Sequence, residues 1–96
     1  MRKVTINNHP VTFNNGFCNA TELGKALGKP FIDWYLDNVV HVVEIANLYD
    51  MPLEKLIQVD YSKSPYEVWT NKLIIDDYCM GTGNHATIMT QLEIGE

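Results

Sequence analysis

Hydrophobic and polar residues alternate near the start of the chain, and this pattern predicts a β-hairpin. Apolar residues fall at every second position in residues 3–7 and again in residues 11–13, with Asn8-His9-Pro10 between them. A second pair of alternating segments, 59–61 and 66–70, is separated by Ser62-Lys63-Ser64-Pro65. We therefore predict two hairpins with a helical region between them.

Helical spacing replaces the alternation after residue 18. Asn19 and Glu22 have the spacing of a capping box at a helix N-terminus. Gly28 favours a left-handed end to this helix, and Pro30 suits the opening turn of a second helix. One face of the first helix carries Ala20, Leu23 and Leu27, and one side of the second carries Phe31, Trp34 and Tyr35.

The remaining chain predicts more short helices. The β-branched run 39–43 fits a strand or a helix, and we favour a helix because its valines keep helical spacing with Ala46. Pro52 begins another helical turn, and Thr70 or Asn71 caps a final helix that Gly81-Thr82-Gly83 ends. The apolar stripe of that helix consists of Ile74, Ile75, Tyr78 and Cys79.

These elements predict one α+β domain over residues 1–96, a length that permits a single modest core. The predicted core residues are Phe17, Leu23, Leu27, Phe31, Trp34, Val68, Ile74 and Tyr78. No apolar run approaches the roughly 20 residues of a membrane span, and no signal-peptide pattern opens the chain. Cys18 and Cys79 lack a disulfide framework, so we expect reduced thiols and a cytoplasmic location.

The most specific motif lies in residues 16–38. It reads G-F-C-N-A-T-E-L, then G-K-P-F, then D-W. This run resembles the opening of the KilA-N family, a small DNA-binding domain of phages and large DNA viruses that typically reads G-F-V-N-A-T-x-L, G-K-x-F and D-W. Cys18 stands where the family usually has valine.

A looser resemblance follows in the second half. Residues 67–71 and 73–76 resemble the family's T-W-V-H-P stretch and the apolar helix after it, with Thr70-Asn71 in place of His-Pro. The resemblance covers residues 4–83 and leaves 84–96 as a C-terminal extension. It implies a compact domain related to APSES-type winged-helix modules, with helices at residues 39–43 and DNA contacts from a helix and a hairpin wing. A homodimer is compatible with it.

Charge is unevenly distributed along the chain, whose net charge is −5. Residues 1–29 hold four basic residues against one acidic residue, whereas residues 30–62 hold one against six. Phosphate contacts are therefore predicted at Arg2, Lys3, Lys25 and Lys29, with Lys63 in the second hairpin loop. The leading hypothesis is a phage- or prophage-type regulatory module that binds duplex DNA without catalysis.

The acidic middle supports an alternative of another class, a small phage protein that binds and inhibits a basic host protein. Such an inhibitor would be of an anti-defence or anti-CRISPR type. Its acidic surface would consist of Asp33, Asp37, Glu44, Asp50 and Asp60. The expected aromatic contact residues are Tyr35, Tyr49 and Tyr61.

Other chemistry has little support in the sequence. The three histidines and two cysteines lack paired metal-ligand spacing, and no Lys-Ser or Lys-Thr follows Gly81-Thr82-Gly83 as a phosphate loop requires. Asp76 and Asp77 are neighbours that point apart on a helix. We expect no cofactor, no metal and no enzymatic activity. Trp34 and Trp69 are predicted to pack in the core, and Asn14-Asn15 to form a turn.

Overall fold

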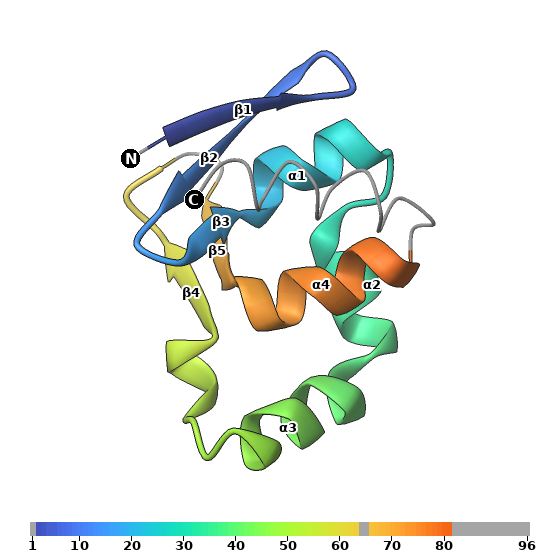
Figure 1. The fold of residues 1–96 in the computed structure, drawn as a ribbon, viewed down its shortest axis with the longest axis vertical. Coiled ribbons are helices and arrows are strands. Elements are labelled where there is room, and N and C mark those ends of the chain that lie inside the picture. The colour runs from blue at the N-terminus through green and yellow to red at the C-terminus, as the bar shows by residue number, and fades with distance from the viewer. Residues whose placement is uncertain (1, 64–65, 82–96) are drawn as a thin grey trace.

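The computed structural model describes residues 2–63 and 66–81, and it is an α+β fold (Figure 1). The elements are β1 (Arg2–Ile6), β2 (His9–Asn14), β3 (Phe17–Asn19), α1 (Ala20–Leu27), α2 (Phe31–Asp37), α3 (Val39–Leu48), the 3₁₀ helix η1 (Leu53–Lys55), β4 (Ile57–Asp60), β5 (Glu67–Asn71) and α4 (Lys72–Gly81). The expected glycine stop beyond Gly81 and the extension 84–96 lie outside the described residues.

One antiparallel sheet joins the two predicted hairpins. The strand order is β1-β2-β3-β5-β4, so the short strand β3 lies between the first hairpin and the second. Helix α1 follows β3 directly and packs against β2 and β5, the two strands that flank β3 in the sheet. Residues far apart in the sequence therefore meet at the centre of the sheet, where Cys18 pairs with Thr70.

The first hairpin turns earlier than the sequence pattern predicted. Asn7 and Asn8 form the turn, with φ of 50° and 67°, and Ile6 pairs with His9 across it. Two consecutive residues with positive φ give the turn type whose twist matches that of the strands, and asparagine tolerates this conformation. The predicted Asn8-His9-Pro10 connection is wrong because His9 and Pro10 already belong to β2.

Helix α1 has the predicted start and end, although only half of the capping box forms. The Asn19 side chain accepts a hydrogen bond from the Glu22 N–H at 3.0 Å, and Gly28 adopts a φ of 76°. The Glu22 carboxylate does not return to Asn19. It accepts the backbone N–H of Thr12 at 2.8 Å and so joins α1 to β2, because the neighbouring strand offers a donor within its reach.

The later helices agree with the spacing of their apolar residues. The run 39–43 is helical, and α3 buries Val42, Ile45 and Ala46. The four residues of the predicted α4 stripe are all buried, and the Asn71 side chain caps this helix by accepting the Leu73 N–H at 2.9 Å.

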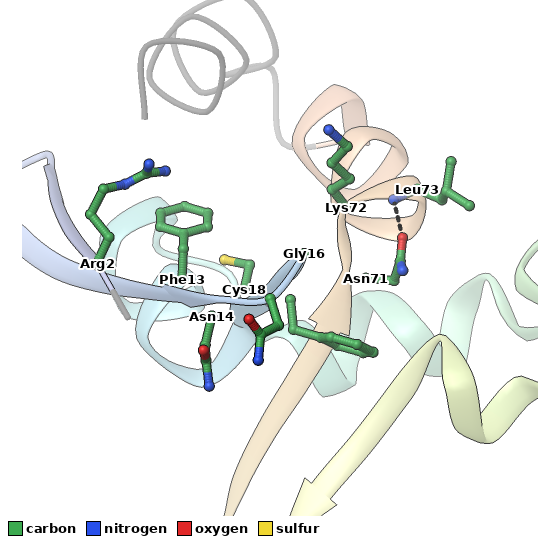
Figure 2. A pocket seen from close by; sticks show the side chains of 10 residues that line it. Arg2, Phe13, Asn14, Gly16, Cys18, Asn71, Lys72 and Leu73 are labelled. Atoms are coloured by element: carbon green, nitrogen blue, oxygen red, sulfur yellow. Dashed lines mark hydrogen bonds between the residues drawn. The ribbon is translucent and has the colours of Figure 1, made fainter. Parts of the chain in front are cut away.

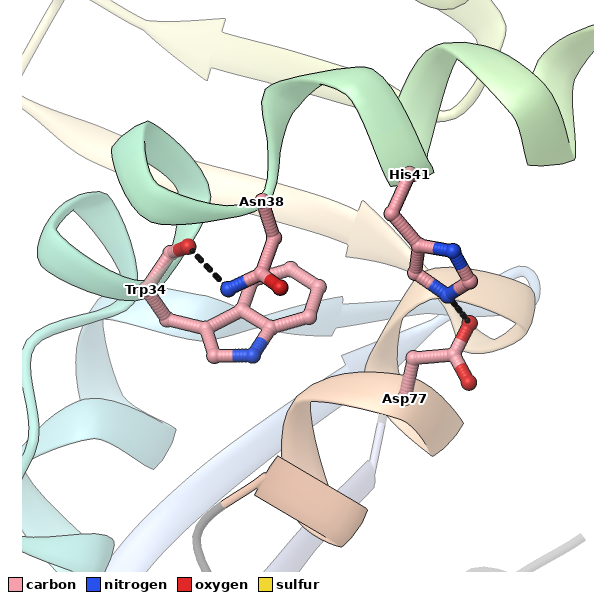
Figure 3. A network of polar contacts seen from close by, with 4 residues as sticks. All are labelled: Trp34, Asn38, His41 and Asp77. Carbon is pink, nitrogen blue, oxygen red and sulfur yellow. Dashed lines mark hydrogen bonds and ion pairs between the residues drawn. The ribbon is translucent and has the colours of Figure 1, made fainter.

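Two polar contacts fix the α2–α3 corner and join α3 to α4 (Figure 3). The Asn38 side-chain amide donates to the Trp34 carbonyl at 2.8 Å. His41 Nε2 lies 3.1 Å from the Asp77 carboxylate.

The core is centred on an aromatic cluster whose rings come from α2 and α4. The Trp34 ring lies 5.7 Å from that of Phe31 and 5.5 Å from that of Tyr78, measured between centroids. Of the predicted core, Leu23, Phe31, Trp34, Val68, Ile74 and Tyr78 are buried, and Leu27 packs against them partly buried.

Phe17 and Trp69 do not belong to the core, contrary to the prediction. Both are only half-buried and lie outside the core cluster. Alternate residues of a strand face opposite sides of a sheet. Since Cys18 and Thr70 point into the core, the residues beside them point away from it.

A candidate nucleic-acid interface

The side of the sheet that faces away from the core carries two aromatic rings between amide side chains. Cross-strand pairing aligns Phe17 with Asn14 of β2 and with Asn71 of β5. It also aligns Trp69 with Asn19 of β3 and with Gln58 of β4. Paired residues point to the same side of a sheet. We call the surface formed by these six residues the outer face: Asn14, Phe17, Asn19, Gln58, Trp69 and Asn71.

A hollow of about 610 Å³ lies across the β2–β3 turn from the outer face, and we call it the basic hollow (Figure 2). Arg2 pairs with Phe13 and Phe13 with Cys18, so these three side chains point to the other side of the sheet from Asn14 and Phe17. Arg2 and Lys72 stand on opposite sides of it. The Arg2 guanidinium lies above the Phe13 ring, 5.8 Å from its centroid, and its buried Nε has no hydrogen-bond partner among the described residues. No carboxylate is among the described residues that line this hollow: Arg2, Phe13, Asn14, Asn15, Gly16, Phe17, Cys18, Asn71, Lys72 and Leu73.

A second hollow of about 770 Å³ adjoins the first, and we call it the aromatic hollow. It contains Trp69 and Phe17, with Lys3 and Lys63 contributed by β1 and by the β4–β5 connection. Three carboxylates also line it, those of Glu22, Asp60 and Glu67.

Two of these three carboxylates have partners within the fold. Glu22 accepts the Thr12 N–H. The Ser62 hydroxyl and backbone N–H both donate to Asp60, and these hydrogen bonds lower the pKa of its carboxyl. The aromatic hollow therefore carries negative charge beside its two lysines, in contrast to the basic hollow.

The turn between β2 and β3 forms the ridge between the two hollows. Asn14, Asn15 and Phe17 line both of them. Asn15 and Gly16 have φ of 52° and 82°, which glycine and asparagine adopt at low cost. The Gly16 carbonyl accepts the Lys72 backbone N–H at 3.3 Å, so the ridge is tied to the start of α4.

Three of the five predicted phosphate-binding residues gather around this ridge. Arg2 lines the basic hollow, and Lys3 and Lys63 line the aromatic hollow. Lys25 lies apart, beside an apolar hollow at α1 and α2. Lys29 lies in the α1–α2 connection, where its carbonyl accepts the Tyr78 hydroxyl.

Sequence reasoning missed Lys72 as a cation of this surface and placed Phe17 and Trp69 elsewhere. Lys72 follows β5 directly, and only the pairing of β5 with β3 brings it near Arg2. In the sequence, the only signal that could have separated Phe17 and Trp69 from the core was the alternation of side-chain direction along a strand.

The residues of the predicted protein-binding surface are more dispersed. Asp33 and Asp37 are exposed on α2. Tyr35 and Tyr61 line an apolar hollow of about 540 Å³ between α2 and the β4–β5 hairpin. Tyr49 is exposed just after α3 and does not line that hollow. Of the other acidic residues, Glu44 and Asp50 are exposed, and Asp60 lies in the aromatic hollow.

The two thiols are buried in the core and are poor ligands or nucleophiles there. Burial raises the pKa of Cys18 well above its ordinary value, and it raises the pKa of Cys79 to about 12. A thiol must ionise to bind a metal or attack a substrate. In residues 2–63 and 66–81, no group of three or more His, Cys, Asp or Glu side chains is arranged to hold a metal ion.

Comparisons of the chain with protein-family models, with curated proteins and with solved structures returned no match. Across the described part of the chain, none of the helices has the length and apolar character that crossing a membrane requires.

Proposed function

We propose that this protein is a nucleic-acid-binding module whose contact surface surrounds the β2–β3 turn. The observation that carries the proposal is the meeting of four cations from three segments of the chain around that turn: Arg2, Lys3, Lys63 and Lys72. Cations that contact phosphates supply most of the affinity of such modules, and asparagine side chains read base edges. Asn14 and Asn15 lie between the cations and are suited to that second task.

The local distribution of charge supports the proposal despite the net charge of −5. Salt screens exposed charges beyond about 8 Å at physiological ionic strength. A phosphate in the basic hollow would therefore respond mainly to Arg2 and Lys72, and much less to the exposed acidic residues of α2 and α3.

The resemblance of residues 16–38 to the KilA-N family supports the same conclusion, since that family binds DNA. On this proposal the protein is a regulatory, non-catalytic module of a phage or prophage that acts in the host cytoplasm.

The experiment is a fluorescence-anisotropy titration with labelled 20-nucleotide DNA, single-stranded and duplex, at several salt concentrations. We expect a Lys3→Ala, Lys72→Ala double variant to bind several-fold more weakly. We also expect the slope of log affinity against log salt to fall by about one to two. Lys55→Ala is the matched control, because Lys55 is exposed on η1 and lines neither hollow. Absence of binding at tens of micromolar protein and low salt would overturn the proposal.

A second candidate function, binding of a basic host protein, is favoured by the apolar hollow between α2 and the β4–β5 hairpin. It presents Tyr61, which is 79% exposed, together with the predicted contact residue Tyr35. Asp33 and Asp37 are exposed one helical turn apart on α2, so they would attract a basic partner. Pull-down from host lysate with the wild type and an Asp33→Lys, Asp37→Lys variant tests it. If both proteins retained a partner equally, Asp33 and Asp37 would be ruled out as part of its binding site.

A further inference from the structure

We infer that the nucleic acid bound at this surface is a single strand whose bases stack on Phe17 and Trp69. The inference rests on the proposed function and adds the class of ligand. It has three supports, namely the placement of the two rings on the outer face, the separation of charges across the β2–β3 turn, and the amide groups beside the rings.

The two rings have the placement of a stacking platform. Phe17 and Trp69 belong to neighbouring antiparallel strands, and their pairing rows are one two-residue step apart. A two-residue step along a strand is about 6–7 Å. Both side chains are half-buried and line the aromatic hollow, so the rings are open to a ligand. Aromatic side chains on an open sheet face stack the bases of single strands, which a duplex keeps paired inside its helix.

The charges around the two hollows give a single strand one orientation and disfavour a duplex. The basic hollow takes phosphates through Arg2 and Lys72. The aromatic hollow has three carboxylates beside Lys3 and Lys63, so it holds phosphates less well than the basic hollow but accepts bases, whose amino groups donate to carboxylates. A single strand can place its backbone on the first side and its bases on the second. A duplex has phosphates along both edges of each groove, so its second backbone would approach the carboxylates.

Amide groups beside the rings supply contacts to base edges. Asn19 and Asn71 already accept backbone N–H groups at the starts of α1 and α4. Asn14, which is half-buried, and Gln58, which is exposed, flank Phe17 and Trp69 on the other sides. Each aromatic ring thus has one amide that is committed to the fold and one that faces a stacked base.

The test compares affinities for one 12-nucleotide sequence as single-stranded DNA, as single-stranded RNA and as duplex DNA, by anisotropy at fixed salt. We expect a single strand to bind at least tenfold more tightly than the duplex. The DNA and RNA titrations distinguish the two sources of the strand. Stacking of one base is worth roughly ten- to a hundredfold in affinity, so Trp69→Ala is expected to weaken single-strand binding by that factor.

Three controls separate stacking from misfolding. Trp69→Phe keeps a ring and is expected to retain most of the affinity. Tyr49→Ala removes an exposed aromatic side chain that lines neither hollow, and it is expected to change nothing. In the wild type, added single strand should quench tryptophan emission, because Trp69 is accessible whereas Trp34 is buried.

The outcomes distinguish the inference from the proposed function. Equal or tighter duplex binding, or equal effects of Trp69→Ala and Tyr49→Ala, would overturn the single-strand inference and leave nucleic-acid binding in place. Binding of no polynucleotide at all would overturn both.

Discussion

Replacing each tryptophan by alanine tests whether the two rings have the different roles that the structure assigns to them. Trp34 is 4% exposed and contacts the Phe31 and Tyr78 rings, whereas Trp69 lies half-buried on the outer face. Because the substitution is chemically the same at both positions, the difference in stability reports the difference in environment. Trp34→Ala is therefore expected to be much the more destabilising.

The magnitude for Trp34 follows from its burial. A buried tryptophan removes roughly 150–250 Å² from water, and at about 25 cal/mol/Å² this amounts to roughly 4–6 kcal/mol as an upper bound. Alanine keeps a small part of that burial, while loss of the two ring contacts adds to the cost. We expect Trp34→Ala to lower the free energy of unfolding by about 4 kcal/mol, within the range of about 3–5 kcal/mol for buried aromatic residues. For Trp69→Ala we expect about 1 kcal/mol.

Urea denaturation followed by circular dichroism measures both values. With an m value of about 2 kcal/mol/M, the midpoint should fall by about 2 M for Trp34→Ala and by about 0.5 M for Trp69→Ala. Domains of this size have a total stability of roughly 5–15 kcal/mol, so Trp34→Phe serves as a milder variant if the alanine protein does not fold. Equal losses at the two positions would refute the assignment, because Trp69 would then belong to the core and the outer face would keep only the Phe17 ring.

Three further predictions concern the thiols and the ends of α1. The free energy of unfolding should fall as pH rises from 9 toward 12. Burial raises the pKa of Cys79 in the folded protein to about 12 from an ordinary value of 9.0. Between these values the Cys79 thiol stays protonated in the folded protein but ionises in the unfolded chain, which favours unfolding. Urea titrations at pH 7, 9 and 10.5 test whether stability falls with rising pH. In a separate assay, reaction of Cys18 and Cys79 with a thiol reagent should be slow until the protein unfolds. Gly28→Ala should cost about 1 kcal/mol because Gly28 has a φ of 76°, and Gly28→Asn should cost less; equal losses would contradict the left-handed helix end. Asn19→Ala should cost about 1 kcal/mol through loss of the cap, and an unchanged melting curve would show that the cap contributes nothing.

Features that depend on neighbouring residues were predictable from the sequence. The Asn19 cap acts over three residues, and the Gly28 helix end is a property of one residue. For residues 39–43, the spacing of the valines allowed a helix and their strand propensity allowed a strand; the helix was favoured partly through the family resemblance, and the segment is helical. In each case the local pattern and the final fold agree, so no long-range contact had to be known.

The orientation of Phe17 and Trp69 could not be predicted in the same way. It depends on the pairing of Cys18 with Thr70, which are 52 residues apart in the chain. A shift of that pairing by one residue would turn every side chain of β3 to the other side of the sheet. Periodicity marks both residues as apolar members of a strand, but only the pairing decides which side faces the core.

The candidate interface depends on long-range pairing for the same reason. Arg2 is far from Lys63 and Lys72 in the sequence, and the strand order β1-β2-β3-β5-β4 brings their segments together. The sequence identified the basic N-terminal third, but it grouped Lys25 and Lys29 with Arg2 because they are near in number. The fold instead places Lys25 in α1 and Lys29 just after it, away from the β2–β3 turn.

On the proposed function, the same strand order would explain how an acidic protein presents a surface for polyanions. Helix α3, which carries Glu44, lies at the opposite end of the molecule from the β1–β2 hairpin (Figure 1). Salt screens exposed charges beyond about 8 Å at physiological ionic strength, so a charge at one end of the molecule acts only weakly at the other. The carboxylates that do lie close, Glu22, Asp60 and Glu67, gather on the side of the aromatic rings and not beside Arg2 and Lys72. On the proposed function, net charge limits how many phosphates the protein can contact, while the arrangement of charge across the β2–β3 turn decides on which side a bound strand would place them.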